Sequence, residues 1–218
     1  MKKIISLILL TIIIFMTGCS TEKNKAIKEE LKIEKKEKIV NNEETKKDEE
    51  DNNISYFKQH EVVDNKEAKA DFILEAYDRD ENIIWDKKWK NLYITELELA
   101  SKPIIKNEFV YIEVYGDLYS IDLKTGKEIW ISKGIGASSK SYIDKDRIYI
   151  TGYYGPFLTC IERKTGKQIW QYDNGDMFWS TSVSKIDDKI VVEYDSAEGA
   201  KKALFSEGGV FIGEEKGY

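Results

Sequence analysis

The chain has 218 residues and a formal net charge of −6 at pH 7, with 34 Lys and Arg against 40 Asp and Glu. This acidic balance argues against nucleic-acid binding and against a polybasic membrane-binding face, because both need clustered cations. His60 is the only histidine, so His-based acid–base chemistry and metal binding have almost no candidate groups.

The first residues predict a lipoprotein signal peptide over residues 1–18. A basic start is followed by an apolar run at 4–15 that is too short to span a bilayer comfortably. Met16-Thr17-Gly18-Cys19 resembles the bacterial lipobox, in which the Cys thiol is diacylated. The resemblance implies a lipid on Cys19 that holds the chain on the extracytoplasmic face of the cell membrane. The alternatives are an ordinary signal peptide with a chance Cys, or an uncleaved anchor.

Residues 19–53 are predicted to form a charged tether. They are dominated by Lys, Glu, Asp and Asn, and they contain no aromatic residue. Such a segment buries too little apolar surface to offset its chain entropy, so we expect it to be disordered or partly helical. The favoured position for a helix is near 25–40, where the residues have good helix propensity.

Residues 54–218 are predicted to form one all-β domain. Segments rich in β-branched and aromatic residues at 109–116, 147–154 and 189–194 are each bounded by turn residues. Shorter polar segments, for example at 138–143 and 180–186, precede the second and third of these and also indicate strands.

Two stretches of this domain are copies of one another. Residues 118–130 read LYSIDLKTGKEIW and residues 158–170 read LTCIERKTGKQIW, with eight of thirteen positions identical and a displacement of forty. Four strands in about forty residues is the content of one propeller blade. Weaker copies at 72–85 and at 204–212, where Phe211 is interpreted as the substitute for the final Trp, bring the array to about four blades.

The repeat's distinctive residues have structural explanations. Asp122 and Glu162 end a strand and are predicted to accept hydrogen bonds from the following turn. Gly126 supplies the positive φ that the turn needs, and Trp130 offers a large apolar plate for the seam between blades. Cys160 stands where the other copy has a serine, so it is interpreted as a small strand residue without a disulfide partner.

LYSIDLKTGKEIW resembles the repeat of pyrroloquinoline-quinone-type (PQQ-like) β-propellers, and the resemblance covers about 160 residues. It implies either a quinoprotein dehydrogenase or a non-catalytic binding module, a group that includes lipoproteins that scaffold envelope assembly. Family propellers usually have more blades than four. The chain therefore forms a small ring, an open arc with exposed edges, or a ring completed by another chain through self-association.

We expect no catalytic, cofactor-binding or metal-binding residues, because the adjacent Cys pair, calcium-ligand spacing and phosphate loop of candidate enzymes are absent from the sequence. The function expected is a non-catalytic lipoprotein that binds or scaffolds another envelope protein. The alternatives are a small-molecule or glycan-binding domain and a degenerate quinoprotein-type dehydrogenase. Loop aromatics often carry protein contacts, although they could equally cover an undersized core. The candidates are Tyr153, Tyr154, Phe157, Phe178 and Trp179.

Overall fold

The computed structural model describes residues 35–41, 53–64, 66–94, 99–153, 155–173, 175 and 179–217. All regular elements in these ranges are β-strands, which form four antiparallel four-stranded sheets and confirm the all-β, propeller-like class. No helix within the described ranges is long and apolar enough to cross a membrane. The predicted signal peptide and Cys19 lie outside the described residues.

Each sheet takes four consecutive strands in chain order, and we call the sheets blades one to four. Blade one contains β1 (Lys35–Asn41), β2 (Tyr56–Asp64), β3 (Lys69–Tyr77) and β4 (Ile83–Tyr93). Blade two contains β5 (Ile104–Lys106), β6 (Phe109–Val114), β7 (Asp117–Asp122) and β8 (Glu128–Ser132). Blade three contains β9 (Ala137–Ile143), β10 (Arg147–Tyr153), β11 (Leu158–Glu162) and β12 (Gln168–Tyr172). Blade four contains β13 (Trp179–Ile186), β14 (Lys189–Ser196), β15 (Gly199–Ser206) and β16 (Phe211–Lys216).

Burial along the strands distinguishes the ends of the array from its interior. In β3 of the first blade, burial alternates, and Phe72, Leu74 and Ala76 pack against blade two. In β10 of the third blade, the five residues from Ile148 to Gly152 are all buried, because neighbouring blades cover both faces. A terminal blade therefore has one face packed and one face open.

Strand β1 corrects the prediction for the tether. Residues 35–41 pair antiparallel with β2, from Lys35 opposite Val62 to Asn41 opposite Tyr56. The expectation of a disordered or helical segment is wrong over these seven residues. An unpaired strand edge offers a row of backbone donors and acceptors, and β1 covers that edge of β2. Blade one thus has four strands only because it recruits one from the charged segment.

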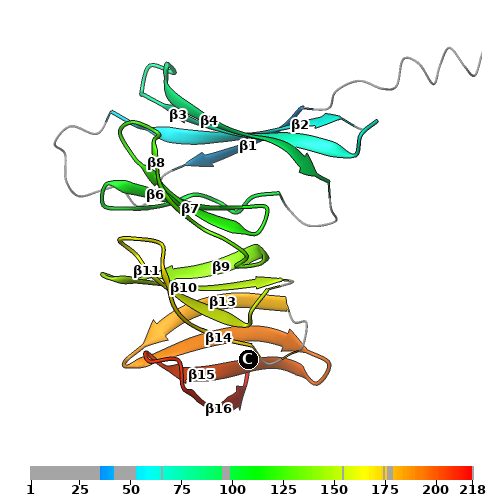
Figure 1. Cartoon of the computed structure of the whole chain (residues 1–218), viewed down its shortest axis with the longest axis vertical. Helices are drawn as coiled ribbons and strands as arrows, with labels where there is room; N and C mark the ends of the chain where they lie inside the picture. The colour runs from blue at the N-terminus through cyan, green and yellow to red at the C-terminus, as the bar shows by residue number, and fades with distance from the viewer. Residues whose placement is uncertain are drawn as a thin grey trace, which may run out of the picture.

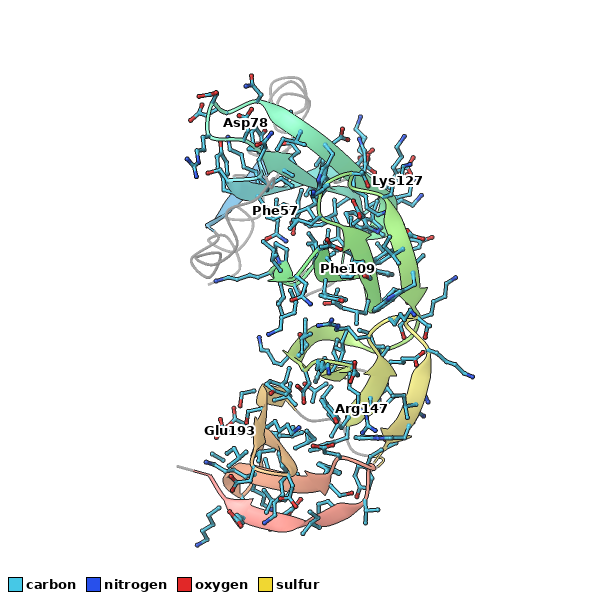
Figure 2. The ribbon with its side chains drawn as sticks, turned by 90° about the vertical axis from the view of Figure 1, so that its left-hand side faces the viewer. Phe57, Asp78, Phe109, Lys127, Arg147 and Glu193 are labelled. Atoms are coloured by element: carbon cyan, nitrogen blue, oxygen red, sulfur yellow. The ribbon has the colours of Figure 1, made fainter. Side chains whose placement is uncertain are left out.

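The blades are stacked in chain order, and Figure 1 shows the first and fourth at opposite ends of the molecule. Figure 2 shows the stack bent into an arc. The described chain is therefore an open arc, one of the alternatives that the sequence left unresolved. Its hydrophobic core consists of three clusters, one in each seam between successive blades.

Candidate functional site

Every seam is closed by the same contact between a tryptophan and a glycine turn. Trp130 of blade two lies flat on Gly166 of blade three, and its Nε1 donates to the carbonyl oxygen of Arg163 at 3.0 Å. The other seams repeat this arrangement, with Trp85 on Gly126 and donating to Leu123 O at 2.8 Å, and Trp170 on Gly209 and donating to Glu207 O at 3.1 Å. The predicted role of the tryptophans at the seams is confirmed.

The turns that receive Trp85 and Trp130 are each held by the carboxylate that precedes them, whereas Ser206 precedes the turn that receives Trp170 and accepts from Val210 N. Asp122 accepts hydrogen bonds from the backbone N–H and the hydroxyl of Thr125 at 2.8 and 2.7 Å. The hydrogen bond from the Thr125 hydroxyl is the main reason why the pKa of Asp122 lies below its usual range. Glu162 accepts the hydroxyl of Thr165 in the same way. These acids are turn caps, as the sequence indicated.

The strand register corrects the interpretation of Phe211. Trp130 pairs with Ser120, and Trp170 pairs with Cys160. The equivalent pair in blade four is Leu204 with Gly213, so a glycine and not Phe211 occupies the tryptophan position. Phe211 was chosen for its aromatic side chain, but it pairs with Phe205 and lies two residues before the tryptophan position.

At the other end of the array, blade one has an altered form of the turn on which a tryptophan docks. Glu81 of blade one stands four residues before Trp85, as Gly126 stands before Trp130, and it has a φ of 63°. A Cβ at this position would meet an incoming indole, as a Cβ at the equivalent Gly126 would meet Trp85. The tryptophan–glycine pair therefore closes the three internal seams, and each open end lacks its half of the pair.

The open faces of the terminal blades carry charged pairs. On blade one, Lys88 Nζ lies 3.0 Å from Asp71 Oδ2. On blade four, Glu193 accepts from Ser182 at 2.9 Å and pairs with Lys202 at 3.1 Å. A polar outer face is what keeps the terminal unit of a repeat array soluble.

The only histidine lies on the side of blade one that faces away from blade two, but it is itself buried. His60 is 3% exposed, and its Nε2 lies 2.6 Å from Glu75 Oε2, which also accepts the hydroxyl of Tyr77 at 2.7 Å. Lys58 Nζ lies 4.7 Å from the centroid of the Tyr77 ring. Among the described residues, no group of three or more His, Cys, Asp or Glu is arranged to hold a metal ion.

Cys160 is fully buried in the seam between blades three and four. Burial raises the pKa of its thiol to about 11. A raised pKa means that the neutral thiol stabilises the fold below the unfolded pKa, and that this stabilisation disappears as pH rises toward 11. Relative to Cys160→Ser, we expect the protein to lose on the order of 1 kcal/mol between pH 8 and pH 10. Urea unfolding at both pH values measures this, and an unchanged difference would contradict it.

The aromatic residues predicted to contact a partner have different positions. Phe157 is 2% exposed and packs edge-on against Tyr194 with ring centroids 5.2 Å apart, so it is a core residue and not a contact. Tyr153 ends β10 and is half-buried. Tyr154, Phe178 and the side chain of Trp179 lie outside what the structure describes.

A groove of about 490 Å³ opens between blades two and three. Its lining is partly apolar, with Tyr111, Trp130 and Ile169, and partly cationic, with Lys145, Arg163 and Lys164. The sequence analysis missed this groove. The signal was present in the twin segments, because Arg163 stands where the first copy has Leu123, and Leu123 is buried in its own seam.

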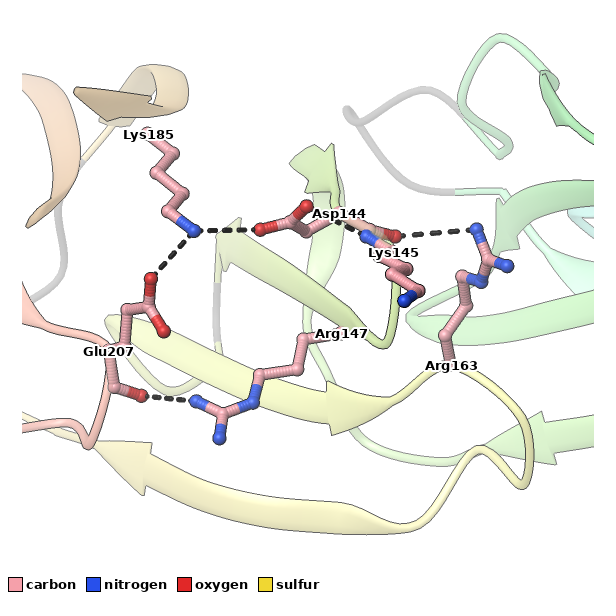
Figure 3. Close-up of polar contacts among 6 residues, drawn as sticks. All are labelled: Asp144, Lys145, Arg147, Arg163, Lys185 and Glu207. Carbon is pink, nitrogen blue, oxygen red and sulfur yellow. Dashed lines mark hydrogen bonds and ion pairs between the residues drawn. The ribbon is translucent and has the colours of Figure 1, made fainter. Parts of the chain in front are cut away.

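Figure 3 shows the polar contacts beside this groove. Arg163 Nη1 donates to the backbone oxygen of Asp144 at 3.3 Å, and the Asp144 carboxylate binds Lys185 at 2.9 Å. Lys185 also lies 2.6 Å from Glu207 of blade four, and these acids raise its pKa. Arg147 reaches away toward blade four, where it donates to Glu207 O at 2.8 Å.

The model of the family described as "Outer membrane protein assembly factor BamB" matches residues 70–212. The crystal structure of BamB from Moraxella catarrhalis is 14% identical, with a TM-score of 0.36, and the match covers 73% of this chain and 61% of that one. A complex of KlAtg21 with the coiled-coil of AgAtg16 is 11% identical, with a TM-score of 0.48, covering 72% of this chain and 52% of that one.

The chain thus spans between about half and three fifths of these similar structures. A search of the curated proteins finds no match. The family match covers most of the chain, and the twin segments fall inside it. By this match, the chain belongs to the PQQ-like propeller family described as outer membrane protein assembly factor BamB.

Proposed function

We propose that this protein is a non-catalytic lipoprotein, anchored through Cys19 to the extracytoplasmic face of the membrane, that binds and scaffolds another envelope protein. The observation that carries the proposal is the match over residues 70–212 to a family described as an assembly factor. That description supports a protein-interaction role for a propeller fold.

The use of the reactive side chains supports a binding role over an enzymatic one. The Nε2 atom of His60 is hydrogen-bonded to the Glu75 carboxylate. Cys160 is buried, and burial raises the pKa of its thiol. A thiolate is the reactive form of cysteine, so this thiol is a poor nucleophile. Asp122 and Glu162 are engaged by the hydroxyls of their own turns.

The anchor is tested by changing Cys19 to serine in cells that express the full chain. We expect the wild-type protein to incorporate labelled palmitate and to fractionate with membranes, because two acyl chains give stable attachment. Cys19→Ser should incorporate no label. Equal labelling of the two proteins would reject Cys19 as the lipid site, and Cys160→Ser is the matched control because it must label normally.

The binding role is tested by cross-linking the full chain in intact cells and identifying the products by mass spectrometry. We expect one envelope protein to be enriched reproducibly, and the same protein to bind the purified chain in a two-component assay. Failure of that reconstitution would reject the scaffold. A separate assay tests for enzymatic activity by adding pyrroloquinoline quinone and Ca²⁺ to the purified chain. Dye-linked turnover in this assay would overturn the non-catalytic assignment.

The altered ends of the array support a monomer over self-association. Neither end offers its half of the tryptophan–glycine pair, since Gly213 replaces the tryptophan and Glu81 replaces the glycine. We expect multi-angle light scattering on the purified protein to give the mass of one chain over a wide range of concentrations. A dimer that strengthens with concentration would show that a second copy completes the array in some other way.

A further inference from the structure

We propose that the groove between blades two and three binds a short acidic segment of the partner protein. Its carboxylate would lie on Arg163, and a neighbouring apolar side chain would lie against Trp130 and Ile169. This inference rests on the proposed binding role and assigns that role to a surface. The groove volume of about 490 Å³ suits a few residues of peptide.

The guanidinium of Arg163 is positioned to receive an anion. Its Nη1 donates to the backbone oxygen of Asp144 at 3.3 Å, which holds the side chain beside the groove. Within the described ranges, no carboxylate lies within 4.0 Å of this guanidinium. Arginine has five N–H donors in a fork that matches a carboxylate, so donors remain for a ligand.

This unpaired arginine contrasts with the lysines that pair with carboxylates elsewhere on the chain. Lys87, Lys88 and Lys185, for example, each lie within 3.0 Å of a carboxylate oxygen. The chain as a whole carries a charge of −6, which repels an acidic segment from most of its surface. Lys145 and Lys164 add to the positive charge around Arg163, although Asp146 and Glu162 offset part of it. Charge therefore favours an acidic ligand at this groove.

The apolar residues of the groove explain why the ligand should also carry an apolar side chain. Trp130 is held by its docking contact, and Tyr111 packs against it with ring centroids 6.0 Å apart. Ile169 of blade three also lines the groove and is 48% exposed. Rigid aromatic residues beside an arginine are typical of binding hot spots.

A single difference between the twin segments explains the groove. In the seam between blades one and two, Leu123 fills the space beside the docked tryptophan and is buried. Arg163 occupies the same position in the next seam but turns toward Asp144, so the space beside Trp130 stays open. Arg163→Leu copies the first seam, and it keeps the backbone carbonyl that accepts Trp130 Nε1.

The test uses the purified full chain and a phage-displayed library of random eight-residue peptides. We expect the wild type to select peptides in which Asp or Glu lies next to Leu, Ile, Phe or Trp. Synthetic copies of these peptides should bind Arg163→Leu at least about tenfold more weakly, as expected for loss of a charge-assisted hydrogen bond. Lys164→Glu should weaken binding of the same peptides, because it places a negative charge in the lining of the groove. Lys124→Glu is its matched control, because the two lysines hold the same turn position beside different seams.

The outcomes separate this inference from the binding role itself. Peptides without an acidic bias, or peptides that bind wild type and Arg163→Leu equally, would overturn the groove assignment. Weakening by Lys124→Glu as strong as that by Lys164→Glu would also overturn it. Displacement of the selected peptides by phosphate alone would point to a small-anion site instead. If the cross-linked partner still binds Arg163→Leu, the scaffold role stands and the groove assignment fails.

Discussion

Replacing Trp130 with alanine should lower the free energy of unfolding by about 3–5 kcal/mol, the range for removal of a buried aromatic side chain. Trp130 is 9% exposed, covers Gly166 and donates to the Arg163 carbonyl, so the change empties the seam between blades two and three. Equilibrium unfolding in urea, followed by circular dichroism, measures the loss.

Ile129→Ala is the matched control for this change. Ile129 is the preceding residue of β8 and is 48% exposed. Its removal should therefore cost less than about 1 kcal/mol, since little apolar area is exposed to water by the change. Equal losses for the two variants would show that the docking contact does not hold the seam. Stability in repeat arrays depends on interfaces between neighbours, so Trp130→Ala should also split unfolding into two transitions.

Gly166→Ala is the second change with a large expected effect, about 2–5 kcal/mol of lost stability. Gly166 has a φ of 71°, a left-handed conformation that costs an alanine about 1–2 kcal/mol. A Cβ at this residue would lie 2.5 Å from Cδ2 of Trp130, so the indole must move, and such overpacking costs about 1–3 kcal/mol more. Thermal unfolding of the purified variant measures the sum.

Gly134→Ala separates the two contributions. Gly134 has nearly the same φ, 69°, but a Cβ there would meet no atom within 4 Å. It therefore reports the backbone cost alone. Comparable destabilisation by the two substitutions would mean that the tryptophan adapts freely. A larger loss for Gly166→Ala identifies close packing against the indole as the additional cause.

The fold was predictable because the twin segments contain both the tryptophan and the glycine turn that meet in each seam. Trp130 and Gly166 belong to different copies of one motif, and a repeat predicts that such residues meet between neighbours. The turn caps followed from the short reach of Asp122 to the backbone two or three residues ahead. Each of these predictions rests either on residues close together in the sequence or on a motif repeated at a fixed spacing.

The errors concern pairings that no local pattern encodes. Strand β1 is polar and charged, and only the free edge of β2 makes it a strand. Phe211 was misassigned because similarity of side chains was preferred to register, which places Gly213 opposite Leu204. For Phe157 the sequence left open a partner contact or a core position, and the three aromatic rings that pack around it show the core position. The groove depends on the direction in which Arg163 turns, which its residue type does not specify.

The docking contacts all run in one direction, because each tryptophan lies on a turn that comes about forty residues later in the chain. A chain emerging from its N-terminus during synthesis or export therefore presents the indole of each blade before the surface that covers it exists. The first three blades each need the next blade to cover their tryptophan, whereas blade four has Gly213 at the tryptophan position. A chain that stops between Trp130 and Gly166, for example, would leave that indole without the turn that covers it.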